Sequence, residues 1–158
     1  MMKAKRSHRP LTVLILLTLA LIWGHSLLGR EASSEESGFV MELVEPVLEI
    51  IVGKGNVTEF LVRKLAHFTE FCILGMELLP FFACRKQLFP HAFLLAWTHG
   101  FFTAFLDETI QIFSGRGPMI QDVWLDVCGC AVGASLMLGI MVWTKKRKIK
   151  SSSTGGHP

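Results

Sequence analysis

Ionisable and amide side chains interrupt three long apolar stretches of this sequence, where hydrocarbon would make unpaired charges costly. In the first of these stretches, Arg63, His67 and Glu70 share one helical face. The complete set is Arg63, Lys64, His67, Glu70, Asp107, Glu108, Gln111, Arg116, Asp122 and Asp126. Arginine beside carboxylates suits the binding of a phosphate or carboxylate head group. These residues are therefore our candidates for a ligand-binding site.

The same residues allow other functions. A catalytic reading makes His67 the acid or base, with Asp107, Glu108 or Asp122 as its partner. The acids could also bind magnesium or calcium, but the neighbouring arginines and lysine argue against this. We therefore predict no metal and no cofactor. A structural ion-pair network that only holds helices together is a further alternative. A transporter or proton pathway is disfavoured, because the first span and the inner half of the last are almost wholly apolar.

Long apolar blocks indicate the elements that position these residues. The chain has 158 residues, of which 51% are hydrophobic and 18% charged. A bilayer of ~30 Å hydrocarbon needs roughly 20 apolar residues per helix. The predicted spans are residues 11–28, 59–84, 88–113 and 120–143, within one membrane domain over 11–143. We therefore predict an all-α fold, an integral membrane four-helix bundle.

An extra amphipathic helix is predicted between the first two spans. Residues 29–38 are polar and acidic, which is typical of a loop. Over residues 39–52, valine, leucine and isoleucine recur at helical spacing, with three glutamates opposite. This stripe is too short to span, so we expect the helix to lie in the membrane interface. Pro46 should start or bend it.

Basic residues determine the predicted orientation. They cluster in residues 1–10, between the second and third spans, and in the tail at 144–158, which we expect to be disordered. With four spans, all three clusters face one side, and the positive-inside rule makes that side cytoplasmic. Both termini are then cytoplasmic. A cleaved signal peptide is the alternative for the first span, but its long apolar run favours an uncleaved one. The net charge of +3 is too small to suggest nucleic acid.

This topology places the ionisable groups of three spans at one depth, near the outer face. Their mutual pairing would lower the cost of burial, and Gly129 and Gly133 would permit the close approach of helices that pairing needs. His25 and Ser26 either close this site from the first span or merely mark that span's end. We predict an outward-facing charged pocket.

At these residues the chain resembles the VanZ-like family of small membrane proteins, named for a teicoplanin-resistance accessory protein. The resemblance covers roughly residues 11–143. It rests on Val62–Glu70 followed by Gly75, on Asp107–Phe113 followed by Gly115 and Arg116, and on Asp122–Asp126 followed by Gly129 and Gly133. Asp126 is often asparagine in that family, so this chain carries one more acid there.

The resemblance implies the bacterial plasma membrane and a role in the cell envelope or in glycopeptide resistance. It supplies no reaction. The partners it implies are membrane lipids, with an envelope lipid precursor or a glycopeptide antibiotic as the ligand.

Overall fold

A computed structural model describes residues 9–84, 88–115 and 119–154 of the chain, all in helices or the turns between them. The five helices are α1 (Arg9–Leu27), α2 (Arg30–Val52), α3 (Glu59–Ala83), α4 (Phe89–Phe113) and α5 (Ile120–Thr154). No strand occurs in these ranges. The all-α prediction is confirmed for the part of the chain that the structure describes.

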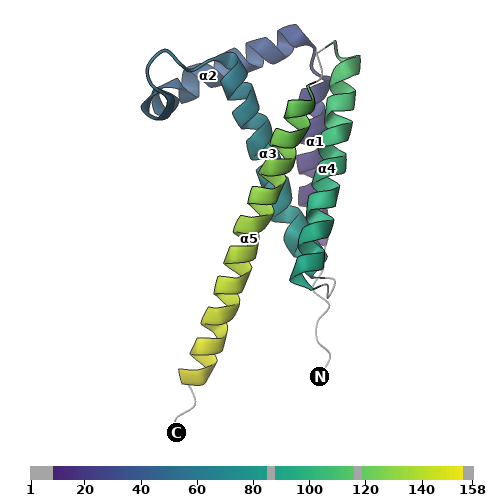
Figure 1. The fold of residues 1–158 in the computed structure, drawn as a ribbon, viewed down its shortest axis with the longest axis vertical. Helices are drawn as coiled ribbons and strands as arrows, with labels where there is room; N and C mark the ends of the chain where they lie inside the picture. The colour runs from purple at the N-terminus through teal and green to yellow at the C-terminus, as the bar shows by residue number, and fades with distance from the viewer. Residues whose placement is uncertain (1–8, 85–87, 116–118, 155–158) are drawn as a thin grey trace.

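Four helices pack along one another, and α2 lies across one end of them (Figure 1). Both α3 and α4 contact α1 and α5, whereas α2 packs on α3. The chain reverses direction between successive long helices, so the start of α1 and the end of α5 lie at the end opposite α2. Local sequence sets some of these limits. For example, the Thr58 hydroxyl accepts a hydrogen bond from the Leu61 backbone N–H at 3.2 Å and caps α3.

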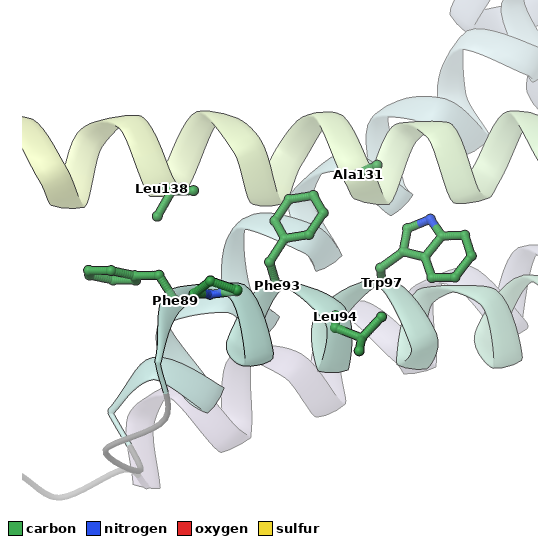
Figure 2. Close-up of a pocket in the computed structure, with 7 residues that line it drawn as sticks. Phe89, Phe93, Leu94, Trp97, Ala131 and Leu138 are labelled. Atoms are coloured by element: carbon green, nitrogen blue, oxygen red, sulfur yellow. The ribbon is translucent and has the colours of Figure 1, made fainter.

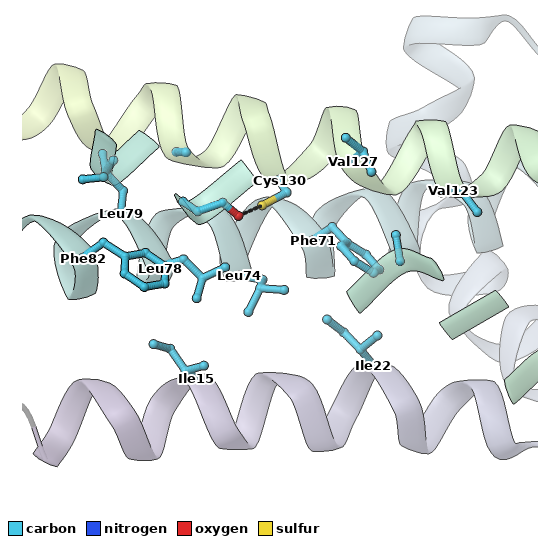
Figure 3. Packing of buried hydrophobic residues seen from close by; sticks show 14 residues of the cluster. Ile15, Ile22, Phe71, Leu74, Leu78, Leu79, Phe82, Val123, Val127 and Cys130 are labelled. Atoms are coloured by element: carbon cyan, nitrogen blue, oxygen red, sulfur yellow. Dashed lines mark hydrogen bonds between the residues drawn. The ribbon is translucent and has the colours of Figure 1, made fainter. Parts of the chain in front are cut away.

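The apolar core runs between α1, α3, α4 and α5 (Figure 3). Ile15 and Ile22 of α1 face Phe71, Leu74 and neighbouring residues of α3. At its centre, the Cys130 thiol of α5 points to the Ala96 carbonyl of α4 at 3.7 Å. The outward faces of the long helices remain apolar and exposed, as helices in contact with lipid should be.

Three helices are long and apolar enough to cross a membrane, namely α1, α3 and α5 as far as Lys150. The fourth, α4, has 25 residues but also carries Pro90, His91, His99 and an acidic pair. These residues lower its mean hydropathy. The fold therefore supports a membrane protein with at least these three apolar helices. The four-span bundle stays a prediction.

Two sequence expectations were wrong in extent. The acidic segment 29–38 is not a loop, because α2 begins at Arg30, and Pro46 lies inside the helix rather than starting it. Ala32 and Glu35 favour helix, which explains the longer element. The tail is helical as far as Thr154 instead of being disordered from residue 144. Its lysines and arginine are good helix formers and continue the last turns of α5.

Candidate functional site

Polar side chains of four helices meet at the end of the molecule where α2 lies. The helix directions bring together the end of α1, the start of α3, the end of α4 and the start of α5. We define the polar cluster as His25, Ser26, Lys64, His67, Glu70, Asp107, Glu108, Gln111, Asp122 and Asp126. Each member is buried or half-buried, so these groups must find partners within the protein.

An ion pair joins α3 to α5. The Lys64 ammonium contacts the Asp122 carboxylate, and each side chain is 18% exposed. The ammonium also lies over the Phe60 ring, 5.0 Å from its centroid. One predicted cation therefore pairs with a carboxylate of the last helix.

Asp107 lies at the centre of the polar cluster and is completely buried. The Ser26 hydroxyl of α1 donates a hydrogen bond to its Oδ1 at 2.6 Å. The Gln111 amide donates to its Oδ2 at 2.9 Å. His67 Nδ1 of α3 lies 3.7 Å from the same Oδ2. One carboxylate is thereby fixed by groups from three helices.

Two further acids are bonded near the helix ends. His25 Nδ1 lies 2.6 Å from Glu70 Oε1, which links α1 to α3. The Met119 backbone N–H donates to Glu108 Oε2 at 3.1 Å and so fixes the entry to α5. Glu108 Oε1 is buried and has no hydrogen bond among the described residues.

Asp126 differs from the other acids. It is 1% exposed, and neither of its carboxylate oxygens has a hydrogen bond in the described part of the chain. One carboxylate oxygen of Asp126 lies within 4.8 Å of a potential ligand atom of His67 and of Asp107. A buried carboxylate with no donor is costly unless a cation or a proton neutralises it.

Arg63 does not contribute as expected. Its Nε is buried without a hydrogen bond, and the described residues offer it no ion pair with a carboxylate. Arg116, the other predicted arginine, lies outside the described residues. The cluster thus contains more acids than paired cations.

The structure contains three contacts that the sequence left open or did not indicate. His25 and Ser26 were open alternatives, yet both bond to cluster acids. Deeper in the core, the Thr18 hydroxyl donates to Glu77 Oε1 at 3.0 Å. For His25 and Ser26, the only signal in the sequence was that two polar residues lie near the end of an apolar span. For Thr18 the sequence offered no signal, because a lone threonine is common in such spans.

Small residues allow α3 and α5 to approach closely beside the cluster. A Cβ built on Gly129 would lie 2.6 Å from the Phe68 carbonyl oxygen of α3. A Cβ on Gly133 would overlap the Cys72 carbonyl, and one on Gly75 would overlap that of Cys130. Only glycine fits at these positions.

Apolar grooves flank the cluster and the core. One of about 500 Å³ lies between α4 and α5 at the cluster end. Its lining includes Phe105, Trp124 and, from the cluster, Glu108. A second groove, of about 620 Å³, lies between the same helices near the start of α4 and is lined by Phe93, Trp97 and other apolar residues (Figure 2).

A family model described as VanZ/LLP1 matches residues 11–143. The chain belongs to the VanZ/LLP1 family. This confirms the resemblance drawn from the sequence motifs. No curated protein and no solved structure gave a match to the chain.

All of the polar cluster lies within the part of the chain that matches the VanZ/LLP1 model. So do the glycines that bring α3 and α5 together. The matched range ends before the basic tail at 144–158, so the tail contributes nothing to the family assignment.

Proposed function

We propose that this VanZ/LLP1 protein is a cell-envelope protein of the bacterial plasma membrane that binds the head group of an amphipathic ligand in its polar cluster. An envelope lipid or a peptidoglycan precursor is the favoured ligand class. Binding a glycopeptide antibiotic such as teicoplanin would give the protein a part in resistance. The proposal rests on the observation that Glu108 belongs to the polar cluster and also lines an apolar groove.

Four spans are part of this proposal. A helix of 25 residues, such as α4, is ~37 Å long at ~1.5 Å per residue. It packs beside three helices that are apolar enough to cross. We propose that α4 crosses with them, that both termini are cytoplasmic, and that α2 lies on the outer membrane surface.

The groove between α4 and α5 suits the apolar part of the ligand. Phe105 and Trp124 line it and are 57% and 56% exposed. An acyl or polyprenyl chain entering sideways from the bilayer would cover these rings. Its head group would then lie against Glu108 and the start of α5. Arg63 of α3, whose Nε has no hydrogen bond among the described residues, is the cation that we propose for a phosphate in the head group.

Lipid analysis of the purified protein tests this proposal. We expect a defined lipid to co-purify in mild detergent and to be identified by mass spectrometry. Trp124→Ala should lose it, whereas Trp143→Ala should retain it, because Trp143 is similarly exposed, at 54%, but does not line the groove. Arg63→Gln should weaken retention of an anionic lipid, whereas Lys54→Gln in an exposed turn should not.

Equal lipid content in all four variants and the wild type would reject the binding site. The ion pairs would then serve only to hold the helices together. Glycopeptide susceptibility of cells carrying each variant tests the proposed role in resistance separately.

A second candidate function is an intramembrane enzyme acting on a lipid-linked substrate. It is favoured by the geometry of His67 beside Asp107, whose carboxylate is oriented by Ser26. Such an arrangement suits a histidine that accepts or donates a proton. If His67→Ala abolished turnover of a lipid substrate without releasing bound lipid, catalysis would replace binding as the function.

A further inference from the structure

Asp126 is buried, yet the described part of the chain offers its carboxylate no hydrogen-bond donor. Its side chain is 1% exposed and points into the contact between α3, α4 and α5. Neither oxygen accepts a hydrogen bond from any described residue. A carboxylate in such a place must be neutralised by a cation or by a proton.

The side chains that lie near Asp126 include two of the types that bind metal ions in proteins. His67 of α3, Asp107 of α4 and Asp126 of α5 each offer one ligand atom, and these atoms lie within 4.8 Å of one another. Two ligand atoms of one tetrahedral zinc ion are ~3.4 Å apart when each bond is ~2.1 Å long. If each of the three ligand atoms moved by less than about 1 Å, all three could therefore coordinate one ion.

The surrounding structure holds these three side chains in place. Ser26 and Gln111 donate to the two oxygens of Asp107, the kind of outer contact that orients a metal-binding carboxylate. Gly129 lies against the Phe68 backbone, next to His67 and one turn from Asp126. The close helix contact thus keeps the imidazole and the carboxylate at one level.

Charge also favours a divalent ion. Lys64 and Arg116 were the sequence argument against a metal, together with Arg63. In the structure the Lys64 ammonium contacts Asp122 rather than Asp107 or Asp126. Arg63 forms no ion pair with either acid among the described residues. A divalent cation bound beside Asp126 would neutralise this buried carboxylate, which has no hydrogen bond among the described residues.

We propose that His67, Asp107 and Asp126 bind a divalent transition-metal ion, with Zn²⁺ or Mn²⁺ as the chemical class. One imidazole nitrogen with two carboxylate oxygens suits these ions better than magnesium, which prefers oxygen ligands. Three protein ligands leave further positions for water or for an oxygen of a bound head group. The site rests on these three residues and does not depend on the proposed lipid binding.

The test is metal binding by the full-length protein in mild detergent after chelator treatment. Titration with Mn²⁺, followed by the electron paramagnetic resonance signal of the free ion, should give one tight equivalent. Asp126→Asn and His67→Gln should each weaken binding at least about tenfold. Glu77→Gln is the matched control, because Glu77 is also a buried acid but lies outside the three ligands. It should bind like the wild type.

Thermal unfolding provides the second measurement. Added Mn²⁺ should raise the unfolding temperature of the wild type and of Glu77→Gln, but not that of Asp126→Asn. The proposal is overturned if the wild type binds no more Mn²⁺ than Asp126→Asn and His67→Gln. It is also overturned if Asp126→Asn without metal is more stable than the wild type and none of the proteins binds the ion. A proton on Asp126 would then be the neutralising partner.

Discussion

Several contacts of the buried charges in the polar cluster cross from one helix to another. The contacts of Lys64 with Asp122, Ser26 with Asp107 and His25 with Glu70 each join two different helices. Such bonds fix which turn of one helix faces which turn of the next. Their loss should therefore affect stability even when no ligand is present.

Breaking the ion pair between Lys64 and Asp122 should destabilise the protein by about 3 kcal/mol, because the remaining charge is largely buried. We expect this loss for Lys64→Met alone and for Asp122→Leu alone. The double variant should recover most of the stability, since it leaves no unpaired charge. Reversible unfolding in mixed detergent measures the cycle. The exposed Lys145→Met is the control, and strictly additive single losses would contradict the pair.

The residues of the site could largely be predicted from the sequence, but their partners could not. Ionisable groups within apolar stretches are easy to recognise in a sequence, and the predicted alternation of span directions places them at one depth. Which donor faces which acid depends on helix rotation, which periodicity does not determine. Arg63, Lys64 and Arg116 were all candidate partners of the carboxylates, and among the described residues only Lys64 forms such an ion pair, while Ser26 bonds to Asp107.

At the scale of elements, the contact between α3 and α5 depends on glycine. Gly75, Gly129 and Gly133 each face the backbone of the other helix. Lipid is as apolar as leucine, so close packing rather than water exclusion holds such helices together. This contact positions Lys64 and His67 against the start of α5.

Gly133→Ala should destabilise the protein by roughly 1–3 kcal/mol or more, because the added methyl meets the backbone at Cys72. The matched control is Gly139→Ala in the same helix. A Cβ there meets nothing within 4 Å, so this change should be neutral or stabilise by up to about 1 kcal/mol. Unfolding in mixed detergent compares the two. Equal stabilities would show that the close contact does not exist in the membrane protein.

The limits of α2 show where sequence patterns are weak. Its amphipathic half was predicted, because the apolar stripe has helical spacing. Its acidic first half has no stripe, and serines and glutamates are compatible with both loop and helix. The structure leaves Phe39, Leu43 and Val47 62–74% exposed along α2. An apolar stripe of this kind fits the proposed position on the membrane surface.

Spin labels test the position of α2. Labels at Phe39, Leu43 and Val47 should be accessible to oxygen dissolved in lipid, because these side chains form the exposed apolar stripe. Labels at Glu42 and Glu45, on the other face of the helix, should instead be accessible to a water-soluble nickel complex. The measurement is power-saturation spectroscopy in liposomes. The surface position would be rejected if both faces of the helix gave the same ratio of accessibilities.

At the scale of the whole molecule, the arrangement of helices and the distribution of basic residues are both compatible with the proposed orientation. The start of α1 and the end of α5 lie opposite α2. Basic residues concentrate near both chain ends and between α3 and α4. A cytoplasmic location of these segments places the polar cluster near the outer face, where an envelope ligand is accessible. The proposed orientation depends on whether α4 crosses the membrane.

Reporter fusions after residues 35, 86, 117 and 150 should read outside, inside, outside and inside. The reason is that α1, α3, α4 and α5 run in alternating directions, and three basic segments then share the cytoplasmic side. If α4 did not cross, the order would be outside, inside, inside and outside. The fusions after 117 and 150 therefore distinguish the two topologies. In the second case the acids of α4 would lie on the side opposite the proposed ligand, and the binding function would be rejected.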